Sequence, residues 1–515
     1  MFAKITSSTL KGVDGYKVTV EVDIARGLPS FSIVGLPDTS IKESKNRVFA
    51  AIRNSGFKFP SKKITVNLAP AHIKKEGPIF DLPIAIGILK AQGKIIGSKS
   101  KDYCFIGEVA LDGTLRPVKG VLSIVLEMRR LKVQGIILPF ANRNEAGVVK
   151  GIEVLPAKDI RDVVDFLNEI KELKSYSVDE RETFTKNDEI MLDLLDIKGQ
   201  LYAKRALEIA SAGGHNILMI GPPGTGKTML ARRLPFILPE MSFEEALQTT
   251  KIHSAFGLID GEVSLIADRP FRSPHHTSSD VALIGGGQNP RPGEVSLAHN
   301  GVLFLDELPE FHRNTLEVLR QPLEDGEISI SRARHTIKFP STVMLVAAMN
   351  PCPCGYYGHP EKKCVCSTHL IDKYSAKISG PFLDRIDIQV DVPSLKLDEL
   401  TTDVLSGDSS LTIRDRVKKA REFQRERFKE EKNLFTNSQM NSKQIKKYCQ
   451  LDPSGKELLR SAVSRLGLSA RAFDRILKVA RSIADLGGKE AIEAGFIAEA
   501  IQYRSLDKKS DNRLS

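Results

Sequence analysis

The chain has 515 residues, of which 41% are hydrophobic and 27% charged, a globular composition with enough length for about three domains. No stretch approaches about 18 uninterrupted apolar residues, and residues 1–6 lack an apolar segment before a small-residue cleavage site. This pattern excludes membrane spans and a secretory signal, so we expect a cytoplasmic protein. The 75 basic and 64 acidic residues give a net charge of +11, which is compatible with a polyanionic partner and does not require one.

The first 170 residues carry both strand and helix patterns. Apolar side chains recur at every second position at Val18, Val20, Val22 and Ile24, which is typical of a half-buried strand. Further strands are predicted at 31–34, 64–68 and 135–139, and helices at about 41–55, 81–91 and 121–131. We therefore predict an N-terminal α+β domain over 1–170. The next residues are charged and lack apolar periodicity, so they predict a linker over 171–190.

A glycine-rich segment follows the apolar run at 216–220 and precedes a helical pattern at 229–234. In this strand-loop-helix context, G-x-x-x-x-G-K-[ST] predicts a phosphate-binding loop whose glycines leave successive backbone N–H groups facing a polyphosphate. Lys227 would reach the β- and γ-phosphates, and Thr228 would place its hydroxyl on Mg²⁺. The residues expected to bind ATP are Gly221, Pro222, Pro223, Gly224, Thr225, Gly226, Lys227 and Thr228.

A second apolar run, 301–305, ends directly in two carboxylates. Asp306 would hold the Mg²⁺ shell, and Glu307 would polarise an attacking water. Alternating helix and strand patterns over 191–395 predict a mostly parallel sheet flanked by helices, the architecture in which phosphate loops occur. From 396 to 505 the pattern is helical, as at 417–423 and, after the expected N-cap Ser469, at 472–480. We predict a helical lid there and a polar tail at 506–515.

Four of the six cysteines lie within fifteen residues, as the pairs Cys352, Cys354 and Cys364, Cys366. Four thiolates in two close pairs suit a tetrahedral structural Zn²⁺ with no open position, and reduced thiols without a metal are the alternative. Cys104 and Cys449 are expected to be ordinary buried or partly buried thiols.

The neighbouring histidines His275 and His276 have side chains that diverge, with no carboxylate or cysteine at ligand spacing, so we expect a mobile loop there rather than a metal site.

Residues 327–339 follow an Asp325-Gly326 turn and alternate as a β-hairpin does. We expect Arg332, Arg334 and Lys338 to share one face of it. In related ring motors a hairpin at this place projects into the central pore and grips nucleic acid, and several basic groups on one face suit phosphate contacts. A solvated basic edge strand is the alternative interpretation.

The segments 269–277, 284–287, 292–301 and 308–311 closely resemble the magnesium chelatase-like AAA+ proteins of the YifB/ComM type, and the match spans nearly the whole chain. The resemblance implies that Asn350, at the end of an apolar strand, is the first sensor that orients the attacking water. It also implies that Arg385 projects into the neighbouring subunit's site and that Arg471 is the second sensor of the lid. An arginine supplied by a neighbour is worth about 10³–10⁵ in rate, so the resemblance implies a ring, expected to be a homohexamer.

The segments 75–78, 105–109, 113–120 and 137–139 resemble the Lon-protease-type domain, and this resemblance covers most of 1–170. Ile79 stands where that family carries its nucleophilic serine, and Leu122 stands at the position of the lysine partner. Since neither a nucleophile nor a base is present, we expect a Lon-like fold without peptidase chemistry.

Together these features predict a multidomain α/β protein with a Lon-like α+β domain, a central P-loop AAA+ α/β/α module and a C-terminal helical lid. ATP would be hydrolysed with Mg²⁺ at subunit interfaces. The residues expected to carry catalysis are Lys227, Asp306, Glu307, Asn350, Arg385 and Arg471. The resemblance implies a motor on single-stranded or branched DNA, like family members associated with competence and branch migration. The alternative is a chelatase-like or protein-remodelling ATPase whose N-terminal domain binds a protein partner.

Overall fold

The computed structural model describes residues 1–179, 192–259, 261–287, 290–332, 335–395, 407–431, 434–466 and 469–504. The chain forms two compact units. The first consists of Met1–Lys186 and Ser242–Ala267, and the second of Asn187–Met241 and Asp268–Ser515.

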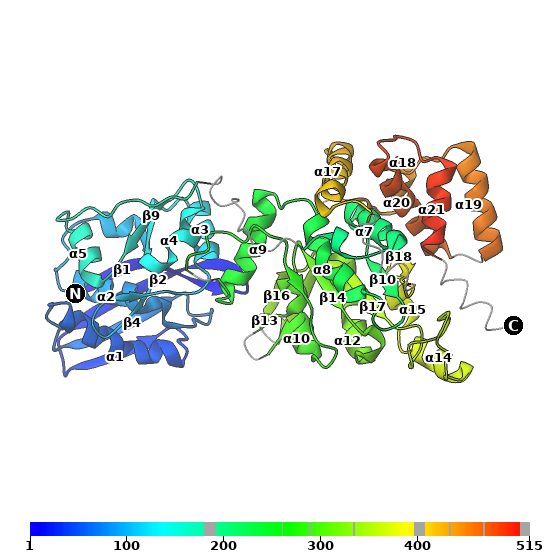
Figure 1. Cartoon of the computed structure of the whole chain (residues 1–515). Coiled ribbons are helices and arrows are strands. Elements are labelled where there is room, and N and C mark those ends of the chain that lie inside the picture. Colours follow the sequence, from blue (N-terminus) through cyan, green and yellow to red (C-terminus); the bar gives the residue numbers. More distant parts are fainter. Residues whose placement is uncertain are drawn as a thin grey trace. The chain divides into compact units, whose positions relative to one another are not determined.

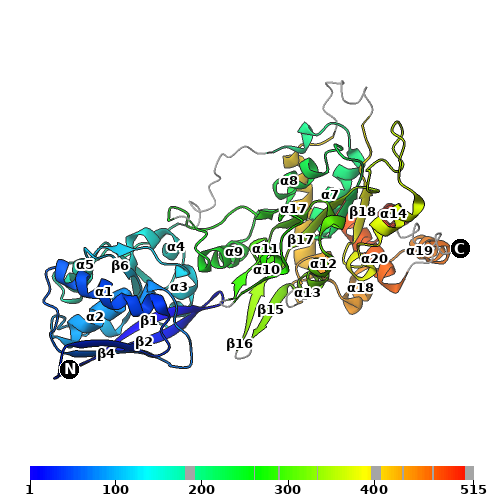
Figure 2. The same ribbon diagram turned by 90° about the horizontal axis from the view of Figure 1, so that it is seen from below.

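The first unit is built on a seven-stranded sheet in the order β3-β4-β2-β1-β5-β8-β9. Its strands are β1 (Phe2–Lys11), β2 (Asp14–Ala25), β3 (Ser30–Val34), β4 (Lys63–Ala69), β5 (Tyr103–Phe105), β8 (Gly135–Pro139) and β9 (Glu153–Ala157), with a small hairpin of β6 (Glu108–Val109) and β7 (Leu115–Arg116) beside them. Its helices are α1 (Thr39–Asn54), α2 (Asp81–Ala91), α3 (Val121–Arg130), α4 (Arg143–Gly147), α5 (Ile160–Leu167) and α9 (Phe243–Ala255). Figure 2 shows α1 and α2 over one face of this sheet.

The elements predicted for the N-terminal region are confirmed. Val18, Val20 and Val22 of β2 are fully buried while the residues between them are not, because successive side chains of a strand point to opposite faces. Helix α1 begins after Asp38, whose carboxylate accepts a hydrogen bond of 2.8 Å from the N–H of Ile41 and so satisfies one free donor of the first turn. The predicted helices at 81–91 and 121–131 correspond to α2 and α3.

Helix α9 belongs to the first unit, although the sequence pattern assigns it to the ATPase range 191–395. The backbone oxygen of Ser254 accepts a hydrogen bond of 3.0 Å from Gly120, and its hydroxyl donates to the buried carboxylate of Glu145. Lys251 pairs with Asp14 on β2. The chain therefore leaves the second unit after residue 241, contributes residues 242–267 to the first unit, and returns to the second unit at residue 268.

The beginning of the predicted linker is ordered against the first unit. The N–H of Tyr176 donates to the oxygen of Val154 on β9 over 2.9 Å, and the N–H of Val178 donates to Gly147 over 3.0 Å. The first contact pairs a backbone oxygen at the outer edge of the sheet, and the second joins the segment to the end of α4. The remainder of 171–190 beyond residue 179 lies outside the described residues.

The second unit contains a five-stranded parallel sheet in the order β11-β14-β17-β10-β18 (Figure 1). Its strands are β10 (Ile217–Ile220), β11 (Phe271–Arg272), β14 (Val302–Leu305), β17 (Met344–Met349) and β18 (Ile388–Asp391), with the hairpins β12 (Gly285–Gly286) with β13 (Arg291–Pro292) and β15 (Glu327–Arg332) with β16 (His335–Pro340). The helices among these strands are α7 (Leu201–Gly213), α8 (Lys227–Ile237), α10 (Asp280–Ile284), α11 (Glu294–Leu297), α12 (Arg313–Val318), α13 (Arg320–Asp325), α14 (Thr368–Ser375) and α15 (Gly380–Leu383). The mixed α/β class with a parallel, helix-flanked sheet agrees with the sequence prediction.

The C-terminal part of this unit is helical, as the sequence predicts. It comprises α17 (Ser410–Arg427), α18 (Ser442–Tyr448), α19 (Pro453–Leu466), α20 (Ala470–Leu486) and α21 (Ala494–Gln502). The hydroxyl of Ser469 accepts a hydrogen bond of 3.2 Å from the N–H of Ala472, so the expected N-cap of α20 is confirmed. Helices α17 and α20 pack against α7, which joins this helical part to the sheet.

Candidate functional site

The parallel sheet brings the three predicted ATP-site segments together. Strands β14, β17 and β10 are neighbours, and the carboxyl ends of parallel strands meet at the same edge of a sheet. Ile220 pairs with Met349 and Leu305 with Ala347 in the register. The phosphate loop, Asn350 and Asp306 therefore follow neighbouring strand ends.

The loop Gly221–Gly226 has the backbone that its glycines permit. Gly224 and Gly226 have φ angles of 80° and 88°, in the left-handed region that favours glycine. A Cβ at Gly221 would lie 2.1 Å from the oxygen of Val392, so only glycine fits at this close approach. Helix α8 starts at Lys227, and its free N-terminal N–H groups follow the loop directly.

Lys227 is nearly buried beneath this loop. Its Nζ donates to the oxygens of Gly221 and Pro222 over 2.7 and 2.8 Å and to Oδ1 of Asn350 over 3.3 Å. Burial lowers the pKa of the Lys227 ammonium, and the charge of Asp306 opposes that shift. The structure thus places the predicted lysine and the predicted sensor amide in direct contact.

Thr228 and Asp306 form the hydroxyl and carboxylate pair that the two motifs predict for Mg²⁺. The Thr228 hydroxyl donates to Oδ2 of Asp306 over 2.7 Å, and Oδ1 of Asp306 accepts from the N–H of Glu307 over 2.9 Å. Hard oxygen atoms of this kind are the ligands that Mg²⁺ takes from proteins, together with waters and phosphate oxygens. The residues present therefore fit a magnesium ion.

Glu307 has a φ angle of 51°, unusual for a residue with a side chain, and its side chain is exposed although it follows the fully buried strand β14. Nδ1 of His276 lies 3.3 Å from its Oε2. His276 follows β11, which pairs with β14, so the neighbouring strand supplies this contact. The ring of His275 instead lies beside Thr277, with Nδ1 2.8 Å from the hydroxyl.

The two predicted arginines do not contact the phosphate loop in the described part of the chain. The guanidinium of Arg385 pairs with Glu324 of α13 and donates to the oxygen of Pro381 over 3.3 Å. Arg471, at the start of α20, pairs with Asp384 over 2.9 Å. Both arginines thus lie near the short segment 379–387, one within it and one bound to it.

The structure contains the predicted hairpin. The expectation that its three basic residues share one face is wrong for Arg332. Lys338 pairs with Ser329 in the antiparallel register, whereas Arg332, three residues further along β15, pairs with His335. Because the faces of a strand alternate with a period of two, positions 332 and 338 belong to opposite faces. Lys338 is exposed and forms an ion pair of 2.6 Å with Glu327. The Arg332 side chain and all of Arg334 lie outside the described residues.

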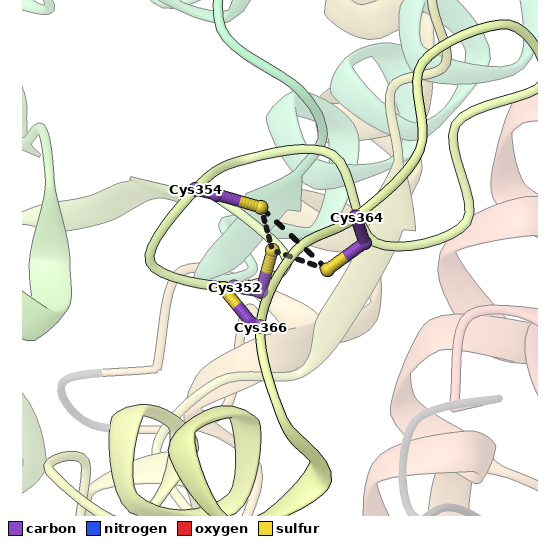
Figure 3. A group of neighbouring side chains, drawn as sticks. All are labelled: Cys352, Cys354, Cys364 and Cys366. Atoms are coloured by element: carbon purple, nitrogen blue, oxygen red, sulfur yellow. Dashed lines mark hydrogen bonds between the residues drawn. The ribbon is translucent and has the colours of Figure 1, made fainter.

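The four clustered cysteines point toward one another (Figure 3). The sulfur atoms of Cys352, Cys354 and Cys364 lie 3.4, 3.5 and 3.7 Å apart, and all four sulfurs lie within 4.8 Å of one another. A tetrahedral zinc with Zn–S bonds of about 2.3 Å separates its sulfurs by about 3.8 Å, so this donor set fits Zn²⁺. Backbone N–H groups of Tyr356 and Val365 lower the pKa of the Cys354 thiol to about 6. Against a backbone hydrogen bond that lowers it, burial and the neighbouring cysteines raise the pKa of the Cys364 and Cys366 thiols, so without a metal only part of the cluster ionises readily.

The cysteine segment also contacts the phosphate loop. Gly355 has a φ angle of 83°, and a Cβ there would lie 2.6 Å from Cδ of Pro223. Cys352 comes two residues after Asn350, so the cluster and the predicted sensor share one short stretch of chain. The other two thiols, Cys104 and Cys449, are buried, as expected.

Sequence reasoning missed several residues that hold the site in place. They are His276 beside Glu307, Glu324 and Asp384 beside the two arginines, and Gln200. The Gln200 amide donates to the oxygens of Pro393 over 2.7 Å and of Thr225 over 3.4 Å, which ties the phosphate loop to the end of β18. Each of these contacts joins residues far apart in the chain, and no local pattern encodes such a pair.

Comparison with known proteins places the chain in a family. Models of the magnesium chelatase subunit ChlI match residues 193–400, the related model of subunit ChlI of Mg-chelatase matches 20–142, and the ChlI C-terminal model matches 407–504. The competence protein ComM of Haemophilus influenzae is 46% identical over 507 residues, which cover 98% of this chain and 97% of that protein. The chain belongs to the ComM/YifB family of magnesium chelatase-like proteins.

The protein YifB of Escherichia coli, of the same ComM/YifB family, is 44% identical over 96% of both chains. Lon protease 2 of Bacillus subtilis is 29% identical over 153 residues, which amount to 27% of each chain. Membership of the ComM/YifB family confirms the resemblance drawn from the motifs and supports a chelatase-like AAA+ ATPase that uses ATP and Mg²⁺. Within the described ranges, no helix combines the length and apolar character needed to cross a bilayer.

Proposed function

We propose that this protein is a ring-forming ATPase that uses Mg²⁺-ATP to act on DNA. The observation that carries the ATPase part is the meeting of Lys227, Asn350 and the Thr228–Asp306 pair at one edge of the parallel sheet. The N–H groups of 221–226 and the start of α8 would bind the phosphates, and Lys227 would leave its carbonyl partners for the β- and γ-phosphates. Thr228 and Asp306 would hold Mg²⁺, which neutralises charge on the phosphates when bound.

Two residues would handle the attacking water. The Asn350 amide, next to Lys227, would orient the water, and the Glu307 carboxylate would accept its proton. The contact with His276 occupies one of the two oxygens of Glu307 and would hold the carboxylate in its present position until it turns toward the water.

Arg385 would complete the site of a neighbouring subunit, so catalysis would require assembly. Its pairing with Glu324 keeps it away from the phosphate loop of its own chain. The Arg471–Asp384 pair would link the C-terminal helices to the residue directly before Arg385. Nucleotide binding in one subunit could then shift the Arg385 side chain that this subunit supplies to its neighbour.

Action on DNA is supported by the ComM relative, whose name connects that protein with competence, and by the β15–β16 hairpin with three basic residues and one acidic residue. The experiment is ATP turnover of the assembled protein with single-stranded, forked and no DNA, with Glu307→Gln as the inactive control. Turnover that is indifferent to all DNA, together with binding that does not weaken steeply with salt, would contradict the proposal.

A chelatase-like or protein-remodelling ATPase is the second candidate, since the family models carry the chelatase description. Replacing Arg332 and Arg334 with alanine separates the two. Loss of DNA binding with basal turnover retained supports the motor, whereas unchanged DNA binding supports a protein substrate.

The first unit would have a Lon-like fold without peptidase activity. Ile79 and Leu122, which stand at the positions of the serine and lysine, are both buried and apolar. Lys75, four residues before Ile79, is buried with its ammonium bound to the backbone oxygens of Gly35 and Pro70. Cleavage of a peptide by the pure protein would contradict this part of the proposal.

A further inference from the structure

The first unit carries a surface on which exposed basic residues surround aromatic rings. It is formed by the exposed side of α1, the loop 55–62 and the edge strand β3. Residues 26–63 contain eight basic and two acidic residues, a net charge of +6 out of +11 for the whole chain. We name this region the basic–aromatic surface.

Three phenylalanines form the apolar part of this surface. The ring of Phe59 lies 4.9 Å from that of Phe49 in an edge-on arrangement and 6.2 Å from that of Phe31. Phe49 is 42% exposed, and the other two are half-buried. Phe31 and Phe59 pack against the core of the first unit, so Phe49 is the ring of this cluster that is exposed to water.

Three exposed basic side chains of this surface have no acidic partner among the described residues. Arg53 lies over Phe49, with its guanidinium carbon 5.5 Å from the ring centre, and Lys58 and Lys62 belong to the loop that carries Phe59. Lys63 pairs with Ser30 and not with Phe31, so it belongs to the opposite face of the sheet.

The two acidic residues of the region are used elsewhere. Asp38 caps α1 and accepts a second hydrogen bond from Gly77, and Glu43 lies 4.0 Å from Arg47. Arg47 also pairs with the buried Asp81 over 2.7 Å, so the positive charge that can meet anions from solution rests on the exposed basic residues of the surface.

We propose that the basic–aromatic surface binds single-stranded nucleic acid. Lysine and arginine contacts to phosphates supply affinity, and exposed aromatic rings stack on bases, which every single strand offers and a duplex hides within its own stack. Phe49 is the ring most open to a base, and Arg53 above it adds a cation beside the stacked pair. The site lies in the first unit, so it is separate from the β15–β16 hairpin.

The inference deepens the proposed action on DNA, and its test is arranged to be independent of that proposal. Binding of a fluorescent oligothymidine of about 16 nucleotides is measured by anisotropy with the full-length protein, without ATP, in the background Arg332→Ala, Arg334→Ala, Lys338→Ala. That background removes the hairpin's basic groups, so the hairpin does not contribute to the binding that remains. If DNA failed to stimulate ATP turnover, the proposed DNA motor would be contradicted. The binding measurement, which uses no ATP, would still test the basic–aromatic surface.

Three variants are compared in that background. Lys58→Ala, Lys62→Ala should lower the slope of log affinity against log salt by about 1.4, because each phosphate contact on a single strand contributes about 0.7. Phe49→Leu, which keeps an apolar side chain and removes the ring, should weaken binding about 10-fold without changing the slope. The matched control Lys101→Ala, Lys132→Ala removes the same charge from exposed lysines outside the basic–aromatic surface and should leave binding unchanged.

A circular dichroism spectrum and a melting temperature equal to those of the background protein check that each variant is folded. Three outcomes would overturn the inference: equal loss in the control variant, an unaffected Phe49→Leu variant, or equal affinity for duplex DNA and for heparin. The first would indicate a diffuse charge effect, and the others would indicate a surface that recognises polyanions without reading bases.

Discussion

Nδ1 of His276 lies 3.3 Å from Oε2 of Glu307, so the loop after β11 holds the carboxylate proposed to activate water. An exposed pair of this kind is worth up to about 1 kcal/mol, or about 5-fold in an equilibrium. We expect His276→Ala to release Glu307, raise turnover without DNA by up to about 5-fold and reduce the further stimulation by DNA. Steady-state ATP hydrolysis measures both. His276→Gln, which keeps a hydrogen-bond donor for Glu307, is the control and should change basal turnover less; His275 is unsuitable, because its ring centre lies 4.1 Å from that of His276. A fall in basal turnover for His276→Ala would show that the histidine orients Glu307 rather than restrains it.

Glu307→Gln and Lys227→Ala should separate hydrolysis from binding. The glutamine keeps the size of the side chain and removes the base, so we expect ATP to remain bound while turnover falls about 10²- to 10⁴-fold. Lys227→Ala removes the ammonium at the phosphates, and nucleotide binding itself should be lost. Filter binding of labelled ATP and phosphate release distinguish the two. Normal turnover by Glu307→Gln would show that another group activates the water.

Arg385→Ala should abolish turnover only when every subunit carries it. Mixed with Lys227→Ala protein, which is inactive for a different reason, it should regain activity, because some interfaces then combine an intact Lys227 with an intact Arg385. Glu324→Ala, which frees Arg385 from its partner within the chain, should stay active. No recovery in the mixture, with mixed assemblies verified by size, would place the action of Arg385 within its own subunit.

The cysteine cluster should hold about one zinc per chain, which elemental analysis of protein purified without chelators measures. In the folded protein, thiol reagents should find few reactive cysteines, since four bind metal and Cys104 and Cys449 are buried. Removing zinc should weaken ATP binding as well as lower the melting temperature, because Gly355 packs on Pro223 of the phosphate loop. Four freely titrating thiols and no zinc would refute the site.

Asp485 should be a large contributor to the stability of the second unit. Its carboxylate accepts hydrogen bonds from Arg427 over 2.9 Å and from the buried Arg481 over 3.1 Å. Asp485→Ala removes the carboxylate that both guanidinium groups share and leaves them only neutral acceptors, namely Asn437 for Arg427 and the oxygens of Lys489 and Glu490 for Arg481. We expect a loss of about 3–5 kcal/mol in the free energy of unfolding. Urea titration followed by circular dichroism measures it. Glu426→Ala, which removes an exposed pair with Lys429, is the control and should change stability by less than about 1 kcal/mol.

The sequence by itself determined what depends on neighbours along the chain. The alternation at Val18–Val20–Val22 predicted β2, the cap at Ser469 predicted α20, and the glycines before Lys227 predicted the loop at the start of α8. These features follow from the period of a strand, the free N–H groups of a helix end and the backbone freedom of glycine, all of which act within a few residues. The order of the motifs also predicted the family.

Only the tertiary structure decided which distant residues meet. It placed His276 beside Glu307 and Arg385 beside Glu324, assigned 242–267 to the first unit, and set the hairpin register that separates Arg332 from Lys338. It also gathered Phe31, Phe49 and Phe59, which come from a strand, a helix and a loop. Such contacts depend on how the sheet and helices pack, and packing free energy is shared among many side chains, so no short sequence pattern carries it.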